Sequence, residues 1–225
     1  MMTYLKAHWQ LLALTALVFA LWQTPVVVPL KILVVFQHEI SHALAAWLTG
    51  GSVEEISISA QEGGFAITRG GNLFAILSAG YLGSLVLGAA LLMVALHSTA
   101  DRAVTAALGA IILLVTLLYI RDLFAIVFCG VAGVVLLGMA RFLGHAANDM
   151  ALRVIGLKCL IYVPYDIFDD TIRRSTLRSD AYMLADAFGG TAMIWGGIWL
   201  VLSGLVIVWC RRRILGQSSN IDLSP

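Results

Sequence analysis

Apolar runs that approach the length of a membrane span recur along the whole chain. A transmembrane helix needs about 20 predominantly apolar residues. Of the 225 residues, 60% are hydrophobic and 12% are charged, whereas soluble domains average roughly 45–50% apolar and about 25% charged residues. The chain is therefore predicted to be an integral membrane protein. The expected spans cover residues 9–29, 31–49, 73–96, 103–120, 123–140, 154–170 and 184–209.

The distribution of basic residues favours six spans over seven. The first run contains Pro25 and Pro29, so we expect it to bend there. Arg211, Arg212 and Arg213 follow the last run and favour a cytoplasmic C-terminus, and Lys6 favours a cytoplasmic N-terminus. Two ends on one side require an even number of spans. The sequence thus predicts an all-α, multi-pass bundle of about six transmembrane helices in the cell membrane.

Residues 52–71 interrupt this apolar pattern. Val53, Ile56 and Ile58 mix with polar residues, and Gly63-Gly64 separates them from a second short run at 65–68. This pattern is typical of a β-hairpin. Open sheet edges are unstable against lipid, so the hairpin must lie in water or be covered by protein.

The remaining features indicate one domain over residues 1–225, with a polar tail at 211–225. There is no long linker or internal repeat. The net charge of +1 and the lack of a basic run argue against nucleic acid as a partner. The isolated Cys129, Cys159 and Cys210 suggest neither a disulfide framework nor a cysteine zinc site. The sequence carries no signal of oligomeric state.

The segment VVFQHEISHALAAWLTGG, at residues 34–51, combines metal-binding side chains with an apolar helix. His38 and His42 are four residues apart, so they share one helical face and can bind one metal ion. Glu39 can take a proton from a metal-bound water, as in the HExxH motif of zinc hydrolases. Ionisable residues are costly in a membrane, which favours a functional site. The alternative is an interfacial helix whose polar face meets water.

A catalytic zinc site usually has a third protein ligand. Asp166, Asp169 and Asp170 lie in PYDIFDDTI, and their spacing places them on one helical face. Asp166 is the deepest and is the predicted ligand; Asp169 and Asp170 are alternative ligands or orient a ligand histidine. The competing interpretation is a helix end in water, with these acids paired to Arg173 and Arg174.

Three motifs together resemble the site-2 protease family of intramembrane zinc metalloproteases, and most closely its small peptidase M50B-like relatives. They are FQHEISHALAAWLTGG, VEEISIS…GGFAIT and SAGYLGSLVLGA, and they lie within residues 36–89. The resemblance implies that His38 and His42 bind Zn²⁺ and that Glu39 is the catalytic base. The family's third ligand is an Asp in an Asn-Pro…Leu-Asp-Gly motif. Here Asp166 follows Val163-Pro164-Tyr165 and has no Gly after it, which leaves the ligand open.

The function implied by this resemblance is hydrolysis of peptide bonds in or near transmembrane segments of membrane protein substrates. Such a substrate must unwind locally, and the strands near 53–68, with Ile56 and Ile58, are predicted to bind it by strand addition. Two other functions stay open. One is a catalytically inactive scaffold with a vestigial site. The other is a metal or ion transporter, although transporters typically show paired repeats, which this sequence lacks.

Overall fold

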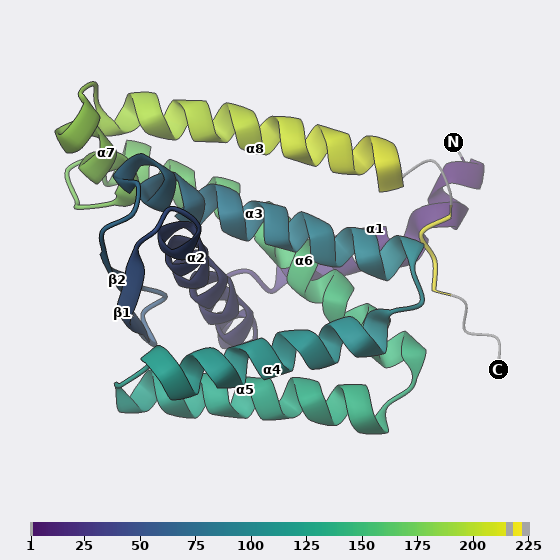
Figure 1. The fold of residues 1–225 in the computed structure, drawn as a ribbon. Coiled ribbons are helices and arrows are strands. Elements are labelled where there is room, and N and C mark those ends of the chain that lie inside the picture. Colours follow the sequence, from purple (N-terminus) through teal and green to yellow (C-terminus); the bar gives the residue numbers. More distant parts are fainter. Residues whose placement is uncertain (1, 215–217, 222–225) are drawn as a thin grey trace.

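The computed structural model describes residues 2–214 and 218–221, and it confirms a helical membrane protein with one small hairpin (Figure 1). In chain order the elements are α1 (Met2–Ala20), the 3-10 helix η1 (Pro25–Val27), α2 (Val28–Leu48), β1 (Ser52–Ile58), β2 (Gly64–Arg69), α3 (Leu73–His97), α4 (Asp101–Tyr119), α5 (Leu123–Phe142), α6 (His145–Phe168), the π-helix η2 (Asp169–Arg173), α7 (Asp180–Phe188) and α8 (Ala192–Ile214).

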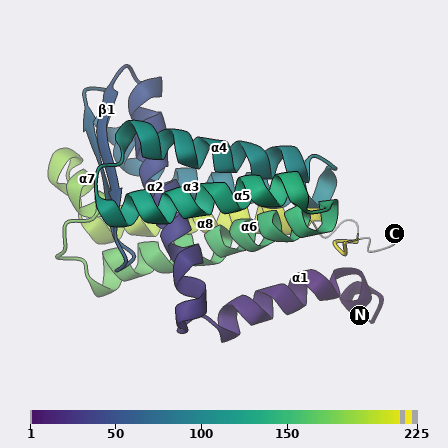
Figure 2. The same ribbon diagram turned by 90° about the horizontal axis from the view of Figure 1, so that it is seen from below.

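The helices form one bundle with two distinct ends. Helices α3, α4, α5, α6 and α8 run alongside one another, while α2 crosses them steeply and α1 lies on the outside (Figure 2). The hairpin and α7 are at one end of the bundle, and the start of α1 and the end of α8 are at the other (Figure 1). At that second end, the Ser219 N–H donates to the Ala7 carbonyl at 3.0 Å. The described part of the C-terminal tail therefore lies against α1.

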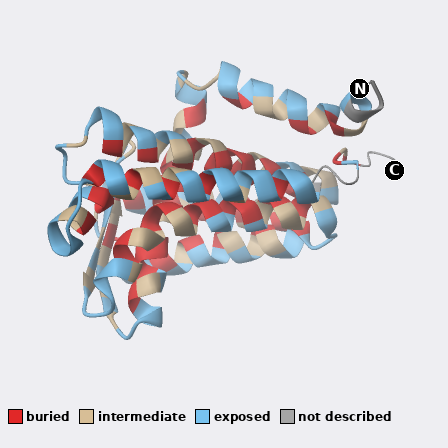
Figure 3. Ribbon diagram, turned by 90° about the horizontal axis from the view of Figure 1, so that it is seen from above, coloured by how far each residue is buried: buried red, intermediate tan, exposed pale blue. Residues whose placement is uncertain are grey.

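The outer surface of the bundle is suited to lipid. Buried residues gather on the inner faces of the helices, and exposed residues face outward (Figure 3). Many exposed side chains are large and apolar, such as Leu117, Leu123 and Phe142, which are 76%, 77% and 80% exposed. In water such a surface would be unfavourable, whereas in a bilayer it is solvated.

Within residues 2–214 and 218–221, five helical stretches are long and apolar enough to cross a membrane, one fewer than the six expected. They are Pro25–Leu48, Leu73–His97, Asp101–Tyr119, Leu123–Phe142 and Ala192–Arg213. The apolar part of α1, Leu5–Ala20, is shorter. Helix α6 runs through the bundle beside α3 but carries several polar residues (Figure 1).

Two expected spans have different boundaries in the structure. Helix α6 begins at His145 rather than near residue 154, because Arg153 and Asp149 are both buried and form an ion pair at 2.6 Å. Their charges are thus satisfied inside the fold. The expected span 184–209 is two helices, α7 and α8, because Gly189 and Gly190 both take a φ of +86° and end the first of them.

Helix α2 is bounded by the features that the sequence suggested. Before it, α1 ends at Ala20, and the expected bend at Pro25 is the short helix η1. After it, Gly50 adopts a φ of +84°. The Gly50 N–H donates to the Trp47 carbonyl at 3.1 Å, and the Gly51 N–H donates to the Ala46 carbonyl at 2.7 Å. These bonds satisfy the end of the helix and turn the chain into β1.

The hairpin is antiparallel, with register from Ser52↔Arg69 to Ile58↔Gly64. The Ser57 hydroxyl donates to Asp122 at 2.7 Å and ties β1 to the start of α5. Ile56 and Ile58, which we expected to contact a substrate, lie in the hydrophobic core instead and are 0% and 2% exposed. The side-chain alternation predicted the strand correctly, but these two positions face α2 and the core.

Candidate metal centre

The two histidines of α2 meet on one face of the helix, as their spacing predicted. Their ring centroids are 4.7 Å apart and the rings are nearly perpendicular. The His42 Nδ1 lies 2.6 Å from the Ile76 carbonyl oxygen. A carbonyl oxygen only accepts, so Nδ1 carries a proton, and Nε2 is the ring nitrogen left for another partner. A hydrogen bond of this kind also fixes the ring orientation.

Both imidazoles direct Nε2 at the same carboxylate oxygen, which belongs to Asp180. The Oδ2 of Asp180 lies 2.9 Å from the His38 Nε2 and 3.3 Å from the His42 Nε2. Ligand atoms about 2.1 Å from a tetrahedral ion are about 3.4 Å apart. In the part of the chain that the structure describes, this is the only cluster of three or more such groups compact enough to hold a metal ion.

Asp180 reaches the histidines because it opens the short helix α7. The Ser179 hydroxyl accepts from the Tyr182 N–H at 3.3 Å and caps this helix. Burial alone raises the pKa of the Asp180 carboxyl, but the adjacent imidazoles of His42 and His38 outweigh it and hold the pKa below its usual range. The Asp180 carboxyl is therefore ionised and suited to binding a cation.

The acids at 169–170 are held by other partners. Asp169 forms ion pairs with Arg174 at 2.8 Å and with Arg173 at 3.5 Å. Asp170 accepts from Arg174 at 2.6 Å and from the Tyr81 hydroxyl at 2.5 Å. The arrangement matches the competing interpretation from the sequence, in which these acids pair with arginines at the end of a helix.

Asp166, the predicted third ligand, lies in the wall of the same cavity but is not a member of the compact cluster. The structure places Asp180 there instead, because the chain folds back after η2 and brings the start of α7 onto the imidazoles. The sequence analysis did not single out Asp180 as a ligand. The signal that it missed is Ser179-Asp180, a capping residue and an acid at the start of a helix.

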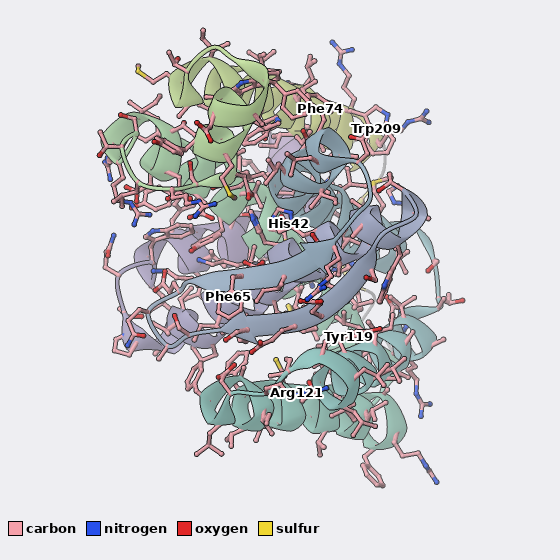
Figure 4. All side chains as sticks on the ribbon, turned by 60° about the vertical axis from the view of Figure 1, so that its left-hand side comes forward. His42, Phe65, Phe74, Tyr119, Arg121 and Trp209 are labelled. Atoms are coloured by element: carbon pink, nitrogen blue, oxygen red, sulfur yellow. The ribbon has the colours of Figure 1, made fainter. Side chains whose placement is uncertain are left out.

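Glu39 lies beside the histidines in a cavity of about 760 Å³ between α2, β2, α6 and α7. Strand β2 comes very close to it, since a Cβ at Gly64 would be 2.6 Å from the Glu39 Oε1. Figure 4 shows the hairpin next to His42, and the labelled Phe65 lies on strand β2 of this hairpin. Helix α3 approaches as closely from the other direction, because a Cβ at Gly80 would be 2.6 Å from the Cε1 of both histidine rings.

A comparison with family models matches residues 11–210 to the Peptidase M50B-like family. The chain belongs to the Peptidase M50B-like family. This family is of intramembrane metalloprotease type, and the match covers His38, His42 and Asp180 together. It also extends the likeness from residues 36–89 to most of the sequence. Comparisons with curated proteins and with solved structures gave no match.

The residues of this M50B-like protein fit zinc. Two imidazole nitrogens and one carboxylate oxygen form a donor set found in catalytic zinc sites, which keep a further position for water or substrate. Gly80 has no side chain, and this leaves room for the rings of His38 and His42. Glu39 completes the HExxH arrangement without belonging to the three-residue cluster.

Proposed function

We propose that this M50B-like protein is an intramembrane zinc endopeptidase that hydrolyses peptide bonds in or near transmembrane segments of membrane proteins. His38, His42 and Asp180 would hold the zinc ion, and Glu39 would act as the catalytic base. The observation that carries this proposal is the convergence of both Nε2 atoms on one oxygen of Asp180, beside Glu39 in a single cavity.

Zinc bound to such residues supplies Lewis-acid chemistry: it acidifies water and polarises a carbonyl group. Glu39 takes the proton that water gives up as it attacks the peptide carbonyl, and it passes this proton to the departing amine. Its position supports both transfers, since its carboxylate lines the cavity one residue from His38. The packing of Gly64 against this carboxylate limits its movement.

Strand β2 is the best placed element to hold the substrate. Its partner β1 lies on the side of α4 and α5, whereas residues 64–68 of β2 line the cavity. An extended peptide can pair with a free strand edge through main-chain hydrogen bonds. This pairing would expose the peptide carbonyl that a helix keeps in its own hydrogen bonds. Ile56 and Ile58 support substrate binding only indirectly, because their buried side chains anchor the hairpin on the core.

The test compares the purified wild type with Glu39→Gln for bound zinc and for cleavage of a panel of transmembrane-segment substrates. We expect Glu39→Gln to keep its zinc and to lose turnover. The control is Glu54→Gln, a change on the exposed part of β1 away from the cavity, which should cleave like the wild type. Absence of turnover in the wild type would favour an inactive scaffold. Zinc flux into liposomes would favour a transporter.

A further inference from the structure

Lys158 is the most unusual charged residue outside the metal centre. It lies in the middle of α6, its side chain is 0% exposed, and its Nζ has no hydrogen-bond partner. Buried lysines are rare unless they are paired, because an ammonium ion loses its hydration. A buried cation without a partner inside a membrane protein indicates a functional site.

Aromatic rings are the closest groups recorded around this ammonium. Its Nζ lies 3.5 Å from the ring centroid of Trp22 and 5.3 Å from that of Tyr162. Such cation–π contacts recover only part of the cost of burial. The charged neighbours do not compensate, because Lys31 and Glu62 already pair with each other at 3.0 Å. Lys158 therefore lacks a full counter-charge.

The residues around Lys158 adjoin the cavity of the metal centre. Trp22, Lys31, Glu62 and Tyr162 all line that cavity, and the half-buried indole of Trp22 covers the ammonium of Lys158. Trp22 is in the turn between α1 and η1, so it is not held within a helix. The indole of Trp22 therefore contacts both the Lys158 ammonium and the cavity.

The distance along α2 from Lys31, beside Lys158, to the zinc ligand His38 corresponds to a few residues of an extended substrate. Lys31 precedes His38 by seven residues, which is two helical turns or about 10 Å. The hairpin follows the same stretch of α2, since Gly64 packs on Glu39 and Glu62 pairs with Lys31. An extended peptide spans about 10 Å with about three residues.

We propose that Lys158, covered by Trp22 and next to the Lys31–Glu62 ion pair, forms a subsite for a carboxylate side chain of the substrate, about three residues from the bond that is cleaved. The indole moves aside, and the carboxylate takes its place as the partner of the Lys158 ammonium. The proposal rests on the proposed function for the position of the cleaved bond, and it assigns a preference for Asp or Glu.

Binding to an inactive enzyme tests this preference separately from catalysis. The full chain with Glu39→Gln is placed in nanodiscs of zwitterionic lipid and titrated with two dye-labelled apolar peptides. The peptides differ only in Glu or Gln at the third residue from the central bond, and a second pair carries the change on the other side of that bond. We expect one Glu peptide to bind about tenfold more tightly than its Gln partner, as for a hydrogen bond between charged groups.

Substitutions then locate the preference. Adding Lys158→Met should reduce binding of the Glu peptide to that of the Gln peptide, whereas Lys158→Arg should keep a preference. The matched control Lys6→Met removes an exposed lysine at the far end of α1 and should change nothing. Zinc content and thermal unfolding identify any variant that does not fold.

Three results would overturn the subsite. One is equal binding of Glu and Gln peptides to the Glu39→Gln parent, which needs no further variant to fold. Another is a preference that survives Lys158→Met. The third is that the parent retains phosphatidylglycerol, the Lys158→Met variant loses it, and the parent shows no preference for the Glu peptide. This result would assign the site to a lipid headgroup. A wild type that cleaves nothing, combined with a Lys158-dependent preference, would refute the endopeptidase and support the subsite.

Discussion

The contact between α3 and the two histidine rings gives a sharp prediction for Gly80→Ala. Carbon atoms in contact normally stay about 3.5–4.0 Å apart, but the new methyl carbon would lie 2.6 Å from the Cε1 of both His38 and His42. The overlap is about 1 Å. The rings cannot turn away together without moving their Nε2 atoms from Asp180.

The expected magnitudes follow from this overlap. Overpacking costs about 1–3 kcal/mol, and replacing Gly by Ala inside a helix returns about 1 kcal/mol. We therefore expect Gly80→Ala to lower the free energy of unfolding by about 0–2 kcal/mol. The effect on metal binding should be larger, because ligand distances must hold to within about 0.2 Å. We expect the zinc affinity to fall by about 10–100-fold, which is the loss typical when a group that orients a metal ligand is removed.

Competition with a chromophoric chelator measures the zinc affinity, and thermal unfolding in detergent measures the stability. The control is Gly138→Ala in α5, where a new Cβ meets nothing within 4 Å. This control should leave zinc binding unchanged and raise stability by up to about 1 kcal/mol. Wild-type zinc affinity in a folded Gly80→Ala protein would refute the proposed arrangement of the ligands.

Four further predictions test the centre and its supports. Asp180→Asn should abolish stoichiometric zinc while Asp166→Asn retains it, as measured by elemental analysis; the reverse result would restore the ligand expected from sequence. Chelation should lower the unfolding temperature, because zinc at 100 times its Kd adds about 2.7 kcal/mol, and Asp180→Asn should remove this difference. Gly64→Ala should displace the Glu39 carboxylate, so turnover in a cleavage assay should fall while zinc content stays; unchanged turnover would argue against the role of β2. Ile58→Ala should destabilise the protein by about 2–5 kcal/mol in thermal unfolding, because its side chain is 2% exposed; a loss of substrate affinity without a loss of stability would contradict this.

Local patterns in the sequence predicted the parts of the site that local structure determines. The four-residue spacing of His38 and His42 depends only on the helix, and Gly50-Gly51 end that helix through their own backbone hydrogen bonds. The same holds for the hairpin, whose alternation and central glycines are sufficient to identify it.

The third member of the metal cluster depends on tertiary structure, and the sequence could not select it. Asp166, Asp169 and Asp180 are all late acids near the ends of apolar segments. The choice among them is made by the turn after η2, which brings Asp180 at the start of α7 to the two imidazoles, and by Arg174, which neutralises Asp169. The direction of Ile56 was unpredictable for a similar reason, because alternation identifies two strand faces without showing which of them meets the core.

The distribution of the cluster along the chain has a consequence for biosynthesis. One continuous segment, residues 28–69, supplies both imidazoles, Glu39 and strand β2, whereas the Asp180 carboxylate comes 142 residues after His38. A nascent chain that has made α2 and the hairpin therefore holds only two of the three donors. Tight metal capture must wait until α7 has been synthesised and has docked. The newly made protein therefore lacks the complete three-residue cluster until nearly all of its helices are in place.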